Sequence, residues 1–200
     1  MITLYHGTSA RHLPSILKSG LQPRKVHGNS NWEGDIQSKA DFVYLTDAYP
    51  VYFALAAAEI GEDLAVIRVE VDERILFPDE DYVALCLKTH DRFYKNIPIT
   101  EINAMIDLYN YRQFWVESLK YNGKAAIPFV RPEAITGHVV IDSDDMQTIL
   151  ATGGDSVPMP LPYQLLGEKY RQILEEMFRS SPKQAGLMSR KIGFWRYEIP

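Results

Sequence analysis

The stretch Leu4-Tyr5-His6-Gly7-Thr8-Ser9 carries the strongest signal of fold in this chain. The apolar run 2–5 predicts a short strand that ends at the His-Gly pair. A helical pattern follows, with apolar residues on one face and Gly20 at the position of a C-terminal cap. Thr8 or Ser9 can cap the start of this helix. We therefore expect His6 and Gly7 to lie where a strand is followed directly by a helix.

The same junction predicts a site for a phosphate-bearing small molecule. Gly7 lets a ligand approach the backbone, and the free N–H groups of a helix start bind anions. Arg11, Arg24 and Lys25 are candidate phosphate partners, since an arginine fork binds two phosphate oxygens at once. The alternatives are that His6 only fills space in an ordinary strand–turn–helix and that the cations are surface charges.

Composition bounds the class of protein. The chain has 200 residues, of which 46% are hydrophobic and 24% are charged, as is typical of one globular domain with an appendage. Its net charge of −5 argues against a protein that wraps nucleic acid broadly, because such binding needs a basic surface. The single cysteine, Cys86, leaves no intrachain disulfide framework. The sequence shows no signal peptide and no apolar run of membrane-spanning length, so we expect a cytoplasmic protein without a membrane partner.

Two kinds of site are not expected from the sequence. The histidines do not group with cysteines or acids at metal-ligand spacings, so no metal site is predicted. No Gly-x-Gly-x-x-Gly follows a strand and no Gly-Lys-Ser/Thr loop occurs. Any NAD site in this chain is therefore not of the Rossmann type.

Patterns further along the chain predict strands and helices within a domain that covers 1–152. Strands are expected at 42–45, 65–72, 125–130 and 138–141, and helices at 48–60 and 80–88. A further helix is expected from about 100, continuing with or without a break towards 120 and ending at Asn122-Gly123. The polar segment 22–41 lacks periodicity and is predicted to be a long loop. Residues 153–200 form a second region: a Gly- and Pro-rich arm at 153–162, an amphipathic helix at 163–179 and a basic, aromatic tail.

Three motifs together resemble the ADP-ribosyltransferase superfamily. They are Leu4-Tyr5-His6-Gly7-Thr8, Ile16-Leu17-Lys18-Ser19-Gly20-Leu21, and Val43-Tyr44-Leu45-Thr46-Asp47 through Ala54. They are similar to the His-Tyr-Glu branch, which includes poly(ADP-ribose) polymerases and diphtheria-like toxins. RNA 2′-phosphotransferases and the nucleic-acid-modifying toxins of toxin–antitoxin and phage-defence systems are relatives. The resemblance covers roughly 2–142 and implies an α+β split fold, in which two small, roughly perpendicular sheets form an NAD cleft flanked by helices.

The resemblance also implies an activity and a set of site residues. The chain would split nicotinamide from NAD, its substrate, and transfer ADP-ribose to a macromolecular acceptor, either protein or nucleic acid. His6 would hydrogen-bond a ribose hydroxyl, the backbone at Gly7 would hold the nicotinamide amide, and Tyr44 would stack on the cationic nicotinamide ring. Thr8 and Arg24 complete the expected NAD-binding set. Without the motif, Tyr44 is an ordinary strand aromatic.

The third element of the family set is a carboxylate that stabilises positive charge developing on the ribose. Glu117, in Gln113-Phe114-Trp115-Val116-Glu117, is our catalytic candidate, and a solvated helix residue is the alternative. In relatives the catalytic glutamate lies near the start of a strand that runs towards a Pro-Glu-X-Ile turn, and here that strand, 124–127, has no acid. Glu133, within the turn, is the second candidate. Trp115 stands where arginine-directed toxins carry Gln or Glu, which argues against arginine as the acceptor.

Two other functions stay open. An RNA 2′-phosphotransferase would also use NAD, but that family has an arginine before the first-motif histidine, where this chain has Tyr5. A non-catalytic member would use the fold only to bind a nucleotide or a partner, and the lack of a glutamate in 124–127 favours it. As partners we expect the acceptor and an antitoxin or regulatory protein. The region 153–200 would contact one of them or, alternatively, pack back on the domain.

Overall fold

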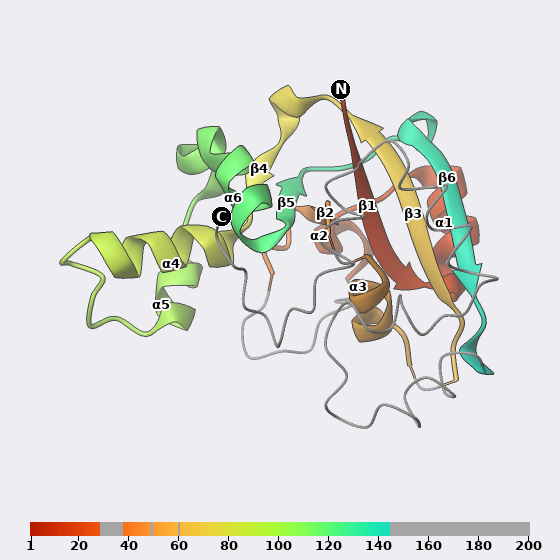
Figure 1. Ribbon diagram of the computed structural model, residues 1–200, viewed down its shortest axis with the longest axis horizontal. Coiled ribbons are helices and arrows are strands. Elements are labelled where there is room, and N and C mark those ends of the chain that lie inside the picture. Colours follow the sequence, from red (N-terminus) through yellow and green to blue (C-terminus); the bar gives the residue numbers. More distant parts are fainter. Residues whose placement is uncertain (29–37, 49, 60, 145–200) are drawn as a thin grey trace.

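In the computed structural model, six antiparallel strands form one sheet in the order β4-β5-β2-β1-β3-β6 (Figure 1). The strands are β1 (Ile2–Ser9), β2 (Val43–Thr46), β3 (Leu64–Val71), β4 (Phe77–Pro78), β5 (Lys124–Ile127) and β6 (Ile135–Ile141). The structure describes residues 1–28, 38–48, 50–59 and 61–144. The arm, the amphipathic helix and the tail predicted within 153–200 lie outside the described residues, as does the middle of the predicted loop 22–41. The described part is a mixed α+β fold.

Helices flank both ends of this sheet. The α-helices are α1 (Leu13–Ser19), α2 (Arg24–His27), α3 (Pro50–Ala57), α4 (Glu80–His90), α5 (Ile99–Met105) and α6 (Trp115–Asn122). Short 3₁₀ helices are η1 (Ala10–His12), η2 (Glu73–Ile75), η3 (Leu108–Phe114) and η4 (Pro132–Ala134). Helix α3 packs against β1, whereas α4 and α5 project from the β4 side of the sheet, away from β6 (Figure 1).

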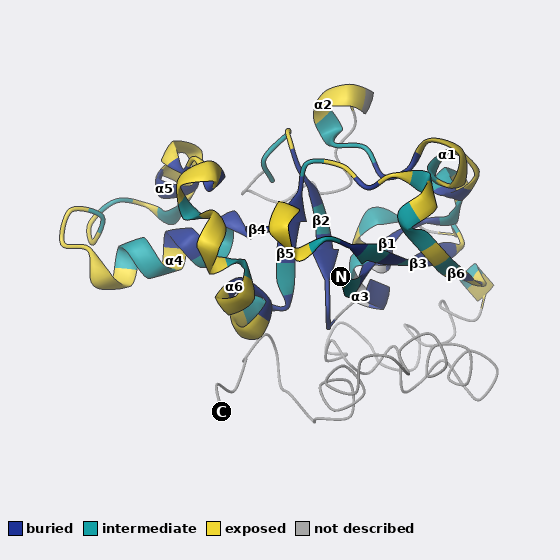
Figure 2. Cartoon of the chain, turned by 90° about the horizontal axis from the view of Figure 1, so that it is seen from above, coloured by how far each residue is buried: buried dark blue, intermediate teal, exposed yellow. Residues whose placement is uncertain are grey.

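The sheet divides into two halves between β1 and β2. Strand β1 pairs with β3 along its whole length, from Ile2↔Val71 to Ser9↔Leu64, but meets β2 at the single register pair Tyr5↔Thr46. Figure 2 shows β2 and β5 running across the direction of β1 and β3. The family resemblance implies two small, roughly perpendicular sheets; the six strands here follow one continuous order, with a single register pair between β1 and β2. Among the described residues, Tyr5↔Thr46 is the single strand-register pair between the halves β4-β5-β2 and β1-β3-β6.

Strand β1 is longer than the sequence pattern predicts. We expected it to end at the His-Gly pair, but His6 and Gly7 lie inside the strand, which continues to Ser9. Ser9 then caps η1 by accepting a hydrogen bond from the backbone N–H of Arg11 at 3.3 Å. The expected helix therefore begins later, at Leu13, and the prediction of a direct strand-to-helix junction at His6 is wrong. The predicted cap at its other end is confirmed, since Gly20 ends α1 with a φ of 78°.

Other boundaries differ where the sequence lacks a clear period. The long helix expected from about 100 towards 120 is divided into α5, η3 and α6, while Gly123 ends α6 in a left-handed conformation. Strand β5 ends before Pro128, and β4, only two residues long, was not predicted. The short helix α2 lies within the predicted loop. These corrections matter for the site, because β4 leads directly into α4.

The core has two parts, a larger one that spans both halves of the sheet and a smaller one beside β4 and β5. The larger part packs α1 and α6 against the sheet, and its fully buried members include Leu4, Leu45, Ile67 and Ile127. The smaller part packs α4, α5 and η3 around Phe77 and Ala126. Buried residues accordingly follow the strands, whereas the C-terminal ends of α4 and α5 are exposed (Figure 2).

Candidate functional site

Tyr44, on β2, is the residue on which the candidate site converges. Its hydroxyl donates a hydrogen bond to Glu80 Oε2 and accepts one from the backbone N–H of Lys39 at 2.9 Å. Its backbone carbonyl lies 3.0 Å from Nδ1 of His6. Burial, together with the nearby acids Glu80 and Asp79, raises the pKa of Tyr44 well above its usual value. The phenol therefore stays neutral and bonded at physiological pH.

The hydrogen bond from His6 determines the protonation of its ring. A carbonyl oxygen can only accept, so Nδ1 of His6 carries a proton and donates it to Tyr44. Burial lowers the pKa of His6 below its usual value, which favours the neutral ring. In that tautomer Nε2 has no hydrogen and offers a lone pair. His6 can therefore accept a hydrogen bond from a ligand hydroxyl group.

The backbone of Gly7 faces the side on which β1 and β2 separate. The N–H of Ala10 bonds the carbonyl of Asp63 at 2.8 Å, which extends the β1–β3 ladder by one pair. Backbone groups alternate in direction along a strand, so the even-numbered residues of β1 are directed at β3 and the odd-numbered ones at β2. Tyr5 meets Thr46 there, and beyond this pair the described part of β2 has no further partner in β1. The N–H and C=O of Gly7 thus point towards the divided edge.

The space into which a side chain at position 7 would point is occupied by the backbone of α3. A Cβ at this position would lie 2.0 Å from the carbonyl oxygen of Pro50 and 2.4 Å from the backbone nitrogen of Ala54. We expected the glycine to make room for a ligand, but on this face it makes room for α3. A ligand can reach Gly7 only through its backbone groups at the strand edge.

Thr8 contains a buried polar atom without a partner. The residue is 1% exposed, and its Oγ1 has no hydrogen bond within the described ranges. Since an unmade hydrogen bond in a buried position costs about 1–3 kcal/mol, such atoms often mark binding sites. The orphaned hydroxyl lies two residues from His6 on the same face of β1. It fits the expected role of Thr8 in binding.

Arg24 is connected to Tyr44 through a single peptide group. Its Nη2 donates to the carbonyl of Ser38 at 2.9 Å, and the N–H of the same peptide, which belongs to Lys39, donates to the Tyr44 hydroxyl. The structure therefore places Arg24, a predicted binding residue, one peptide group from Tyr44. The guanidinium anchors the segment before β2 in place.

The other predicted phosphate partners are engaged elsewhere. Arg11 forms ion pairs with Glu59 at 3.0 Å and Glu62 at 2.7 Å on an exposed surface. Lys25 pairs with Asp41 at 2.9 Å, also on the surface. Both cations are thus occupied by carboxylates in this structure, which agrees with the alternative that they are surface charges.

Glu80, the first residue of α4, is the carboxyl group in contact with Tyr44. It is 2% exposed, an unusual position for a glutamate. Burial, and then the neighbouring Asp79, raise the pKa of Glu80 to about 8. At neutral pH it therefore holds a proton in most molecules. The sequence analysis did not select this residue.

Lys124 forms ion pairs with both aspartates beside Glu80. Its Nζ lies 2.7 Å from Asp79 and 2.8 Å from Asp81, and these carboxylates raise its pKa despite burial. Burial raises the pKa of Asp79, whereas Lys124 and a hydrogen bond from Asn103 bring that of Asp81 below its usual value. No ion pair joins Lys124 to Glu80 among the described residues. Lys124 begins β5, where the family resemblance places the catalytic glutamate.

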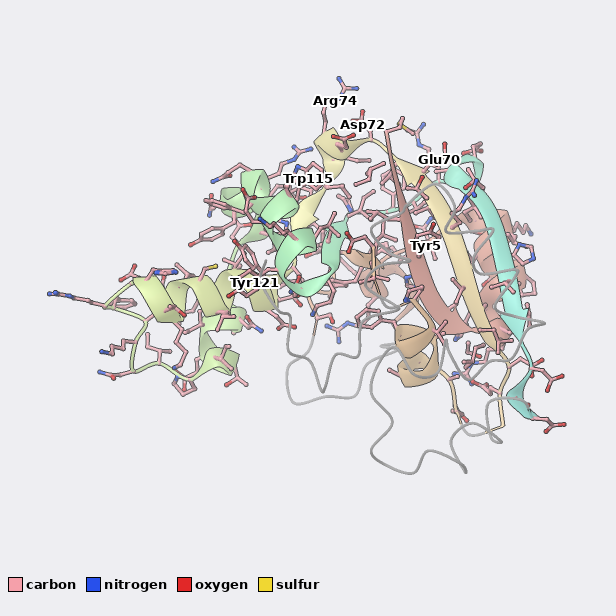
Figure 3. All side chains as sticks on the ribbon, in the orientation of Figure 1. Tyr5, Glu70, Asp72, Arg74, Trp115 and Tyr121 are labelled. Carbon is pink, nitrogen blue, oxygen red and sulfur yellow. The ribbon has the colours of Figure 1, made fainter. Side chains whose placement is uncertain are left out.

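The two carboxylates predicted from the sequence lie away from Tyr44. Glu117 is exposed in the first turn of α6, where its charge acts on Tyr82. Tyr121, on the same helix (Figure 3), packs against the ring of Tyr82. Glu133 is exposed in η4. In the described structure neither residue has a hydrogen bond or ion pair with His6 or Tyr44. The structure brings together His6, Gly7, Thr8, Arg24 and Tyr44, but not Glu117.

The sequence did carry a signal for the missed residues. Asp79-Glu80-Asp81 is an acidic run that follows the apolar Phe77-Pro78. The helix expected at 80–88 includes Glu80 and Asp81, but no role was predicted for these acids because nothing local shows that two acids of the run are buried. Their burial depends on Lys124 and Tyr44, which come from distant parts of the chain.

No family model matches the sequence, and comparison with curated proteins finds no match. Within the described ranges, no helix has the length and apolar character needed to cross a membrane. In the same part of the chain no three histidine, cysteine, aspartate or glutamate side chains are grouped so that they could hold a metal ion.

Proposed function

We propose that this chain is an NAD-dependent ADP-ribosyltransferase that binds NAD where β1 and β2 separate. The observation that carries the proposal is the convergence of His6, Gly7 and Tyr44. Residues from two motifs 38 positions apart meet through the bond from His6 to the Tyr44 carbonyl. The single pair that joins the two halves of the sheet supports the split fold implied by the family resemblance.

Each residue offers chemistry that suits NAD. The free Nε2 of His6 accepts a hydrogen bond from a ribose hydroxyl. The N–H and C=O of Gly7 match the acceptor and donor of the nicotinamide amide. Tyr44 presents an aromatic face to a cationic ring, and the orphaned hydroxyl of Thr8 gains a partner.

The proposed reaction breaks the bond between ribose C1′ and the nicotinamide nitrogen. The bonding electrons leave with nicotinamide, and positive charge develops on the ribose. The acceptor nucleophile then forms a bond to C1′ and loses its proton. Holding the ring and the ribose in fixed positions lowers the entropic part of the barrier. The acceptor is a protein or a nucleic acid, and a toxin or effector role follows from the same resemblance.

Whether the chain has the carboxylate of the third motif distinguishes the proposed enzyme from the alternative, a protein that binds NAD without turning it over. Glu117 is the residue that the family resemblance proposes for catalysis, and it is exposed on α6. The start of β5 instead holds Lys124, tied to two aspartates. This substitution favours, as a second candidate, a member that binds NAD or a related nucleotide without turning it over.

Isothermal titration of the full chain with NAD tests the binding step. We expect binding by wild type and roughly several-fold weaker binding by both His6→Ala and Tyr44→Ala, because each contact contributes on the order of 1 kcal/mol. Circular dichroism verifies that each variant is folded. Affinities unchanged from wild type in both folded variants would refute the site. Binding without release of nicotinamide would favour the non-catalytic alternative.

A further inference from the structure

The charges around Glu80 do not balance. Three acids, Asp79, Glu80 and Asp81, follow one another at the start of α4. Lys124 is the cation that contacts this run, and both of its ion pairs go to the aspartates. The carboxyl group of Glu80, which is 2% exposed, bonds the neutral phenol of Tyr44 and its own backbone N–H, and no ion pair joins it to a cation among the described residues. A buried carboxylate without a positive partner is costly, so Glu80 keeps a proton while the site is empty.

A second observation points to a ligand beside this run. Asn103 is 4% exposed and donates through Nδ2 to Asp81 at 2.9 Å, while its Oδ1 has no hydrogen-bond partner among the described residues. Thr8 Oγ1 is the corresponding atom on the β1 side. One unpartnered buried polar atom thus lies on β1, beside the strand that carries Tyr44, and one lies on α5, beside the acidic run that contains Glu80, and both can bond a polar ligand.

We propose that Glu80 is a positioning residue for Tyr44 and that binding of a cationic nicotinamide ring on Tyr44 releases the proton of Glu80. This inference rests on the proposed function. The ring supplies the positive charge that the site lacks, and the carboxylate then holds the phenol hydroxyl, and with it the ring plane of Tyr44, more strongly. Glu80 would thereby replace, in charge though not in position, the acid absent from β5.

The titratable groups that face Glu80 change protonation in different pH ranges, so proton release by Glu80 can be distinguished from release by most of its neighbours. Asp79 and Asp81 precede and follow it, Lys124 faces them from β5, and Tyr44 faces Glu80 from β2. His6 contacts the Tyr44 carbonyl and has a lowered pKa, so it titrates below neutrality. Lys124 and Tyr44 titrate at high pH because the pKa of each is raised. Proton release between pH 7 and 8 therefore reports on Glu80, or on Asp79 coupled to it.

The experiment is titration of NAD into the full chain at pH 7 in two buffers with different enthalpies of ionisation. We expect wild type to release close to one proton, and its affinity to rise up to about tenfold per pH unit from pH 6 to 8. Glu80→Gln, which is neutral and nearly isosteric, should release none and show affinity independent of pH. Glu101→Gln, the same change at an exposed position on α5, should behave as wild type.

Each other outcome refutes a definite claim. Binding by wild type without proton release, or with the same release from a folded Glu80→Gln, overturns this inference and leaves the proposed function in place. No binding by wild type overturns both. If Glu80→Gln does not fold, the pH dependence of wild-type affinity decides alone, and a flat profile between pH 6 and 8 refutes the inference.

Discussion

The hydroxyl of Tyr44 donates a hydrogen bond to the buried carboxyl group of Glu80, 36 positions further along the chain. The same hydroxyl accepts from the backbone of Lys39, and the Tyr44 carbonyl accepts from His6. One residue, through its side chain and its backbone carbonyl, therefore connects β1, β2, the start of α4 and the segment that Arg24 anchors. The stability of the fold and the geometry of the candidate site depend on the same contacts.

Replacing Tyr44 with phenylalanine removes the hydroxyl and keeps the ring. The N–H of Lys39 and the carboxyl of Glu80 then lose a shared partner in a mostly buried place. We expect the free energy of unfolding to fall by about 1–3 kcal/mol, measured by urea denaturation. Tyr109→Phe is the control, because Tyr109 is 63% exposed. Equal, small losses for both variants would show that the Tyr44 hydroxyl contributes little.

The raised pKa of Glu80 predicts how stability depends on pH. The folded protein holds this proton up to about pH 8, whereas the unfolded chain releases it near 4.5. Between these values the folded state binds more protons, so the contribution of Glu80 to stability falls as pH rises. The melting temperature of Glu80→Gln relative to wild type should therefore increase from pH 5 to pH 9. A constant difference over this range would contradict a buried, protonated Glu80.

Gly7 and Gly137 provide a matched pair for testing the packing of α3. A Cβ on Gly7 would meet the backbone of Pro50 and Ala54, while a Cβ on Gly137, in β6, meets nothing within 4 Å. We expect Gly7→Ala to destabilise the protein by about 3 kcal/mol or to prevent folding, because the α3 backbone must move. Gly137→Ala should be close to neutral. Thermal denaturation of both variants measures the contrast, and a harmless Gly7→Ala would show that α3 does not lie on β1 as described.

Lys124→Met tests the buried ion pair at the start of β5. It leaves Asp79, which is 1% exposed, without its cation, and we expect a loss of about 3–5 kcal/mol. Part of this loss should disappear at acidic pH, where Asp79 becomes neutral. The control Lys25→Met removes an exposed pair and should cost less than about 1 kcal/mol. If Lys124→Met and Lys25→Met lower the free energy of unfolding by equally small amounts at neutral pH, the buried ion pair does not stabilise the fold more than the exposed one.

The sequence was sufficient for features that are encoded locally. The strand at Val43–Thr46, the end of α1 at Gly20 and the end of α6 at Gly123 follow from apolar period and glycine position. The pairing of His6 with Tyr44 could be anticipated only through the resemblance, because 38 positions separate them. The strand and the two helix ends were thus predictable from short patterns of neighbouring residues, whereas the pairing of His6 with Tyr44 was not.

The rest depends on contacts between distant parts of the chain. The continuation of β1 through Gly7 to Ser9 depends on pairing with β3 and on α3 above it. The two-residue strand β4 exists because it pairs with β5. The burial of Glu80 follows from Tyr44 on one side and the Lys124 cluster nearby. No local period distinguishes such an acid from one in a solvated loop.

The most direct test of the central claim is whether the full chain releases nicotinamide from NAD. The protein is incubated with NAD labelled in the adenylate part, with and without cell lysate, and free nicotinamide is measured by chromatography. We predict nicotinamide release by wild type, strong reduction in folded His6→Ala and Tyr44→Ala, and label on an acceptor that protease or nuclease treatment then assigns to protein or nucleic acid. NAD that stays intact in the presence of wild type and lysate, under conditions where titration shows it bound, would contradict the account.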